Sequence, residues 1–161
     1  MKAILLSFCF IVFFVNADLG EIRKIYPNAI KSESNAKELV SKVNDVTFES
    51  DRALVAYKGA SITLVAKFTK GLGQKMRTFK EGVKWIEFAI TKEPNNIEIR
   101  LVRLSVQENV PGITHYNKNI KEDAAFITYH YKEQSGAMKT YIKDFILQSK
   151  SFSDTEKQNL K

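Results

Sequence analysis

The sequence predicts an all-α protein with a single domain of about six helices. Along most of the chain, apolar residues recur at intervals of three and four positions, which is the spacing of one helix face. The segments with this pattern are separated by short breaks that contain glycine, proline or asparagine. No stretch alternates between apolar and polar residues over the length of a strand. Together these observations favour helices joined by short connections.

The first residues have the composition of a secretory signal peptide. Lys2 is followed by an apolar run from Ala3 to Val15, and Ala17 is a small residue suited to a cleavage site. A transmembrane helix needs about 20 residues, so the run is too short, and an uncleaved N-terminal anchor is the alternative. We therefore expect an exported protein, periplasmic or secreted, with no transmembrane segment after cleavage.

Three regions follow from this interpretation. They are residues 1–17 as the signal peptide, residues 18–33 as an irregular lead-in with a turn at Pro27, and residues 34–161 as the helical domain. Cleavage after Ala17 leaves 144 of the 161 residues, a length that suits one domain. It also removes Cys9, the only cysteine, so the exported chain holds together without disulfides.

The chain is basic. Its formal charge of +7 at pH 7 falls to +6 when Lys2 is removed with the signal peptide. The lysines are scattered and no run of five basic residues occurs, which is typical of a solvated surface. We expect no nucleic-acid partner, while attraction to a polyanion or an anionic membrane surface is an alternative.

Two helices are predicted in the first half of the domain, over residues 35–46 and 51–69. The apolar stripe of the first consists of Ala36, Leu39, Val40 and Val43. The second contains Gly59, which costs about 1 kcal/mol relative to alanine inside a helix. This glycine indicates either close packing against a neighbour or a break. A strand over residues 60–68 is the alternative, because several of its residues are β-branched.

Residues 75–92 and 96–108 form the helix pair around which the domain is organised. The first helix carries Trp85, the only tryptophan, beside its apolar stripe, so we expect it to contact more than one neighbour. Pro94 ends that helix. The second helix is apolar on two opposite sides, formed by Ile97, Leu101 and Leu104 and by Ile99, Val102 and Val106. A helix with this pattern is sandwiched between two layers, so we expect it to be central.

Two more helices are predicted over residues 121–132 and 137–150, the second with strong apolar periodicity. The residues Ser153-Asp154-Thr155-Glu156 have the pattern of a capping box. They predict the start of a short last helix, which Leu160 can anchor to the rest of the domain.

Gly82, Ile86, Ala89 and Pro94 resemble the second helix of a tetratricopeptide (TPR) unit. In that family the small residues admit the partner helix, and the proline sets the following turn. The resemblance covers one unit: the preceding helix lacks the tryptophan–leucine–glycine–tyrosine pattern, and no self-repeat of about 34 residues is visible. It implies TPR-like antiparallel packing of one helix pair.

A longer set of residues resembles a family of small exported bacterial proteins with no assigned activity. The similarity spans about residues 53–123 and includes Ala56-Tyr57-Lys58-Gly59-Ala60, Pro94-Asn95-Asn96-Ile97-Glu98-Ile99-Arg100, Arg103, Gln107, Pro111 and Asp123. It implies an exported all-helical domain and no particular reaction. Residues 112–116 depart from the family, which more often has Phe-Leu-Gly-Tyr after the proline.

The sharpest polar pattern consists of Glu98, Arg100, Arg103, Gln107 and Asp123. An arginine side chain presents a planar fork that suits carboxylates or phosphates. These residues, with His115 in the loop that follows, are therefore candidates for binding an anion or an acidic peptide. The alternative is a buried network that ties residues 96–108 to residues 121–132, with Asp123 or Glu122 as the acidic partner.

Three functions are open at this point. The first is an exported, non-enzymatic module that binds a protein partner or an acidic ligand through Arg100 and Arg103. The second is a small envelope hydrolase that uses Glu98 or Asp123, which requires both carboxyl groups to face one cleft. The third is a polyanion or membrane-surface binder. We assign no catalytic residue and expect no cofactor or metal, because His115 and His130 lack ligand spacing and cysteine partners.

Overall fold

The computed structural model describes residues 17–160, and all the regular secondary structure within this range is helical. The α-helices are α1 (Leu19–Ala29), α2 (Glu33–Lys42), α3 (Arg52–Phe68), α4 (Leu72–Lys92), α5 (Ile97–Gln107), α6 (Ile120–His130), α7 (Gly136–Gln148) and α8 (Asp154–Gln158). Two short 3-10 helices are η1 (Gly112–Thr114) and η2 (Tyr131–Glu133). The predicted all-α class is confirmed. The predicted signal peptide, apart from Ala17, lies outside the described residues.

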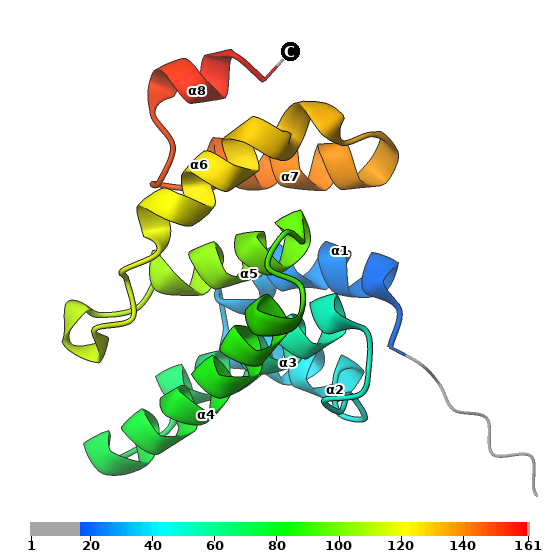
Figure 1. Ribbon diagram of the computed structural model, residues 1–161. Helices are drawn as coiled ribbons and strands as arrows, with labels where there is room; N and C mark the ends of the chain where they lie inside the picture. Colours follow the sequence, from blue (N-terminus) through cyan, green and yellow to red (C-terminus); the bar gives the residue numbers. More distant parts are fainter. Residues whose placement is uncertain (1–16, 161) are drawn as a thin grey trace, which may run out of the picture.

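The helices are arranged in layers with α5 in the middle. Figure 1 shows α2, α3 and α4 below α5, α1 beside it, and α6, α7 and α8 above. Two separate hydrophobic cores meet at this helix. Ile99, Val102 and Val106 belong to the core built with α1 to α4, whereas Ile97, Leu101 and Leu104 belong to the core built with α6 to α8. The prediction that a helix apolar on two sides is central is therefore confirmed.

Helices α3 and α4 pack against each other with their backbones in direct contact. A Cβ atom added at Gly59 would lie 2.6 Å from the carbonyl oxygen of Gly82, and one added at Gly82 would lie 2.6 Å from the carbonyl oxygen of Gly59. Only glycine permits an approach this close. Of the two explanations for Gly59 inside a helix, close packing is therefore the correct one. The alternative of a strand over residues 60–68 is wrong, because all of them lie within α3.

The expectation of an irregular lead-in over residues 18–33 is wrong, because Leu19–Ala29 form α1. Asp18 caps this helix by accepting a hydrogen bond from the backbone N–H of Gly20 at 2.8 Å. Pro27 lies in the last turn, so its missing N–H removes one helical hydrogen bond and leaves the earlier turns intact. Ile22 and Ala29 are each 1% exposed, which shows that α1 is part of the core.

Two further predicted features are present: a second neighbour for α4 and the capping box before α8. Trp85 stacks on Phe48 of the α2–α3 connection with ring centroids 3.9 Å apart, so α4 has a second neighbour beyond α3, as predicted. The capping box at Ser153 and Glu156 is present at the start of α8. Leu160, which follows α8, is 8% exposed and belongs to the same core as Leu101 and Leu104 of α5. None of the helices between residues 17 and 160 combines the length and the apolar composition that crossing a membrane requires.

Candidate functional site

The predicted arginine pair lies on α5, where both side chains reach Asp123 on α6. Arg103 binds this carboxylate in a bidentate manner: its Nε donates to Oδ2 and its Nη2 to Oδ1, each at 2.7 Å. Arg100 donates to Oδ1 of the same carboxylate through Nη1 at 2.9 Å. Asp123 is fully buried and Arg103 is 4% exposed. Bidentate, charge-assisted pairs of this kind are among the strongest hydrogen bonds in proteins, so Asp123 is a structural partner of both arginines.

Arg100 also contacts the turn before α5 and further residues of α6. Its Nε donates to the carbonyl oxygen of Pro94 at 2.7 Å, and its Nη1 also donates to Glu122 at 2.7 Å. The guanidinium lies over the ring of Phe126, 4.3 Å from the centroid. The hydrogen bond from Arg100 lowers the pKa of Glu122. The side chain therefore ties the turn before α5 to the first turns of α6.

Arg103 extends the network towards α4. Its Nη1 lies 3.4 Å from the Glu87 carboxylate, whose other oxygen accepts a hydrogen bond from the Tyr116 hydroxyl at 2.6 Å. Desolvation is the largest single effect and lowers the pKa of Arg103, but the hydrogen bonds to Asp123 and the charges of Asp123 and Glu87 together leave the pKa raised. Burial and the neighbouring Glu87 raise the pKa of Tyr116. At neutral pH the arginine therefore stays charged and the tyrosine stays protonated, as structural groups do.

Glu98 belongs to a second network on another side of α5. Arg23 of α1 donates to both of its carboxylate oxygens, from Nε and Nη2, each at 2.7 Å. The buried Tyr57 hydroxyl donates to the same carboxylate at 2.9 Å and lies 2.9 Å from the Tyr141 hydroxyl. Burial raises the pKa of Tyr57 and of Tyr141. This network ties α1, α3 and α7 to α5.

The two carboxylates considered for hydrolysis therefore do not share a site. Glu98 precedes Arg100, the ligand of Asp123, by two residues on α5, and two residues correspond to a rotation of about 200° around a helix. Glu98 and Asp123 are 4% and 0% exposed; Glu98 is bonded to Arg23, and Asp123 to Arg100 and Arg103. The geometry that a carboxylate pair in one open cleft requires is absent from this part of the chain.

The remaining two candidates lie at the edge of the first network. Gln107 is 1% exposed, with its Nε2 3.4 Å from the Asn119 side chain, and its Oε1 has no hydrogen-bond partner among the described residues. His115 is exposed and follows η1 in the left-handed conformation, with φ of 52°. Neither residue reaches the arginines through a hydrogen bond between residues 17 and 160.

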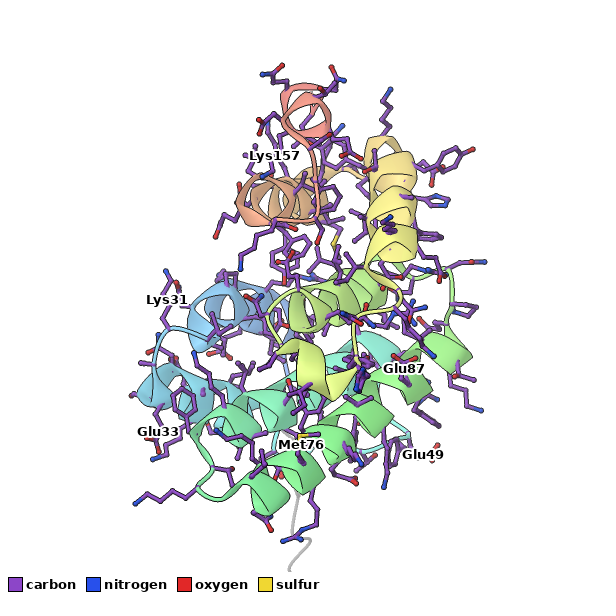
Figure 2. All side chains as sticks on the ribbon, turned by 90° about the vertical axis from the view of Figure 1, so that its left-hand side faces the viewer. Lys31, Glu33, Glu49, Met76, Glu87 and Lys157 are labelled. Atoms are coloured by element: carbon purple, nitrogen blue, oxygen red, sulfur yellow. The ribbon has the colours of Figure 1, made fainter. Side chains whose placement is uncertain are left out.

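The described structure contains a groove of about 1180 Å³, which we call the α1–α7 groove. It lies between α1, α7, the ends of α3 and α4 that meet near Gly71, and the segment around η1. Apolar side chains from all of these elements line it, among them Tyr26, Leu64, Met76, Phe79, Val106 and Phe145. Met76 of α4 and Lys31, which follows α1, line the groove and are both labelled in Figure 2. A groove of this size and lining is the usual form of a binding site.

Cations dominate the polar part of the groove. Its lining contains Arg23 and five lysines, Lys24, Lys31, Lys67, Lys75 and Lys150. The acidic residues of the lining are Glu108 and Asp144. Glu108 already accepts hydrogen bonds from the Ser149 and Ser151 hydroxyls at 2.6 and 2.9 Å. The ratio of basic to acidic residues is higher in this lining than in the whole chain, which has 25 basic and 18 acidic residues, so the groove attracts negative charge.

Two large apolar side chains at the groove are exposed to solvent. Leu72 in the first turn of α4 is 70% exposed, and Ile113 in η1 is 71% exposed. Sequence periodicity assigns no role to either residue, because each lies at the edge of a helical pattern. The groove was missed for the same reason: its residues come from five segments that only the folded chain brings together.

The described residues hold no group of three histidine, cysteine, aspartate or glutamate side chains placed to bind a metal ion. Comparison of this chain with known protein families, with curated proteins and with solved structures found no significant match.

Proposed function

We propose that this chain is an exported, non-enzymatic helical module that acts by binding a ligand in the α1–α7 groove. The observation that carries the proposal is the groove itself, a largely apolar space of about 1180 Å³ with lysines around it. The exposed side chains of Leu72 and Ile113 support it, because a ligand in the groove would cover apolar surface that now faces water.

Arg100 and Arg103 are weaker candidates for ligand binding than the groove. Arg100 and Arg103 are 9% and 4% exposed, and Asp123 already occupies their hydrogen-bonding groups. An acidic ligand would have to displace a buried carboxylate of the chain and leave it without partners, which is costly. A hydrolase with Glu98 and Asp123 lacks support for the reason given above, since each carboxylate is paired within its own network.

The α3–α4 hairpin gives the module its rigid frame, and we infer that it packs as a TPR-like antiparallel pair. In support of this, the backbone contact between Gly59 and Gly82 places small residues at the crossing of the two helices. The frame holds the ends of α3 and α4 at one wall of the groove, so a ligand would meet a surface that is already formed.

The proposal is tested by titrating the protein with a neutral solvatochromic dye such as Nile red and following its fluorescence. We expect saturable binding of one dye per protein. Leu72→Asp and Ile113→Asp change exposed residues of the groove and should leave the far-UV helical signal unchanged. Covering one such side chain contributes about 1.5 kcal/mol or more, so each variant should weaken dye binding about tenfold.

Leu147→Asp is the matched control, because Leu147 is 47% exposed and does not line the groove. This variant should bind the dye as the unchanged protein does. Absence of saturable binding, or an equal loss in the Leu147 variant, would show that the groove is not the binding surface.

A further inference from the structure

The polar atoms on the inner surface of the α1–α7 groove already have partners. The Tyr26 hydroxyl and the Ser105 Oγ are 2.5 Å apart, and the Thr63 hydroxyl donates to the carbonyl oxygen of Ala60 at 2.8 Å. Burial raises the pKa of Tyr26 to about 12, so its hydroxyl stays neutral. A ligand seated against these groups gains little from polar atoms of its own. A hydrocarbon chain suits such a surface better than an extended peptide, whose backbone groups need hydrogen-bond partners.

Two lysines of the groove lining are bonded to residues near the C-terminus of α1. Lys67 of α3 donates a hydrogen bond from Nζ to the carbonyl oxygen of Ile30, the residue before Lys31, at 2.9 Å. Lys31 in turn donates to the Asn28 side chain at 2.7 Å. Neither lysine lies within 4.0 Å of a carboxylate between residues 17 and 160. Each ammonium group has three protons, so both can donate to a further acceptor.

From this combination we infer that the groove binds a fatty acid, with the hydrocarbon chain on the apolar walls and the carboxylate at Lys31 and Lys67. This inference rests on the function proposed above and specifies the ligand. Leu64 lines the groove one helical turn before Lys67, so an apolar wall continues directly from the lysines. The site is concave, and concave sites enclose most of a small ligand. A single free acid therefore fits it better than the flat surface of a bilayer.

The test compares three ligands that share a chain of the same length: laurate, 1-dodecanol and dodecylamine. Each is titrated into the protein below its aggregation limit, with displacement of the neutral dye as the readout. We expect all of them to compete for one site and laurate to bind about tenfold more tightly than 1-dodecanol, because hydrogen bonds between charged groups add to the shared apolar contact. Dodecylamine should bind most weakly, since it places a cation beside two lysines.

The double variant Lys31→Gln/Lys67→Gln removes both of these charges from the groove lining. It should weaken laurate binding about tenfold and leave 1-dodecanol binding unchanged. Lys118→Gln/Lys121→Gln is the matched control, because it removes two charges from exposed lysines that do not line the groove. This control should bind laurate with unchanged affinity, which separates a local carboxylate site from the general effect of net charge.

The outcomes distinguish the two proposals. If the dye does not bind, so that no ligand can displace it, the function proposed for the groove is wrong. If laurate and 1-dodecanol bind equally, or if both double variants lose laurate binding equally, the groove binds apolar ligands but the carboxylate site is wrong. Co-sedimentation with phosphatidylcholine–phosphatidylglycerol vesicles, without binding of monomeric laurate, would overturn the inference in favour of a membrane surface.

Discussion

Asp123 accepts three hydrogen bonds from the two arginines of α5, and its removal is the most direct test of the buried network. In Asp123→Ala, Arg100 keeps Glu122 and the Pro94 carbonyl, but Arg103 keeps only Glu87 at 3.4 Å. Because Arg103 is 4% exposed, water cannot easily replace the lost carboxylate. Breaking a buried pair in this way costs about 3–5 kcal/mol.

The cost is measured by urea unfolding at pH 7, followed by the far-UV circular dichroism signal. The same loss should lower the thermal midpoint by about 10 °C or more for a domain of this length. The double variant Arg103→Met/Asp123→Leu replaces both partners by apolar side chains of similar size. Replacing a buried pair by well-packed apolar groups is often neutral, so the double variant should recover most of the stability that the single variant loses.

The reasoning is refuted if Asp123→Ala lowers the free energy of unfolding by less than about 1 kcal/mol, the range of an exposed ion pair. It also fails if the double variant is as unstable as the single one, since the cost would then not come from an unpaired charge. The double variant Arg100→Ala/Arg103→Ala separates a structural role of the two arginines from a role in ligand binding. We expect it to destabilise the fold. If the two arginines bound a ligand instead, the variant would lose binding while the fold stayed intact.

Two further predictions concern the α3–α4 helix pair and Glu122 of α6. Gly59→Ala and Gly82→Ala each place a methyl group 2.6 Å from a backbone oxygen, and overpacking of about 1–3 kcal/mol should exceed the gain in helix propensity of about 1 kcal/mol. Gly73→Ala in α4, which has no atom within 4 Å, is the matched control and should be neutral or stabilising in urea unfolding. Glu122 has a lowered pKa because Arg100 binds its ionised form, so it stabilises the fold above its ordinary value of 4.5 and loses this effect as the pH falls through the lowered pKa. The difference in unfolding free energy between the protein and Glu122→Gln should therefore shrink below pH 4.5, and a difference that stays constant would contradict it.

The sequence was sufficient for the elements whose pattern is long and unbroken. The two apolar sides of α5 place it between two cores because each side must find an apolar partner. The prediction for residues 18–33 is wrong because it interprets Pro27 as a turn, although a proline in the last turn of a helix removes only one hydrogen bond. The missed signal was a stripe of Ile22, Ile25, Tyr26 and Ala29 behind Asp18, a cap residue.

The polar residues could be singled out from sequence, but their pairing could not. A buried arginine needs an acidic partner, and Asp123 and Glu122 were the expected ones. Arg23 as the partner of Glu98 could not be foreseen, because the two residues are 75 positions apart. The groove is harder still, since periodicity describes one helix at a time and the groove exists only between elements.

Two walls of the groove are held by one buried network on α5. Helices α1 and α7 are both tied to α5 through one carboxylate: Arg23 binds Glu98, Tyr57 binds the same group, and Tyr57 lies 2.9 Å from Tyr141 of α7. Both helices also line the groove, so this network holds two of its walls in place. The networks that hold the layers together are buried, whereas groove residues such as Leu72 and Lys31 are exposed. Arg23 and Tyr141 belong both to the Glu98 network and to the groove lining. The residues changed in the binding tests, such as Leu72 and Lys31, take no part in the buried networks, so those variants test binding without removing the contacts that hold the fold together.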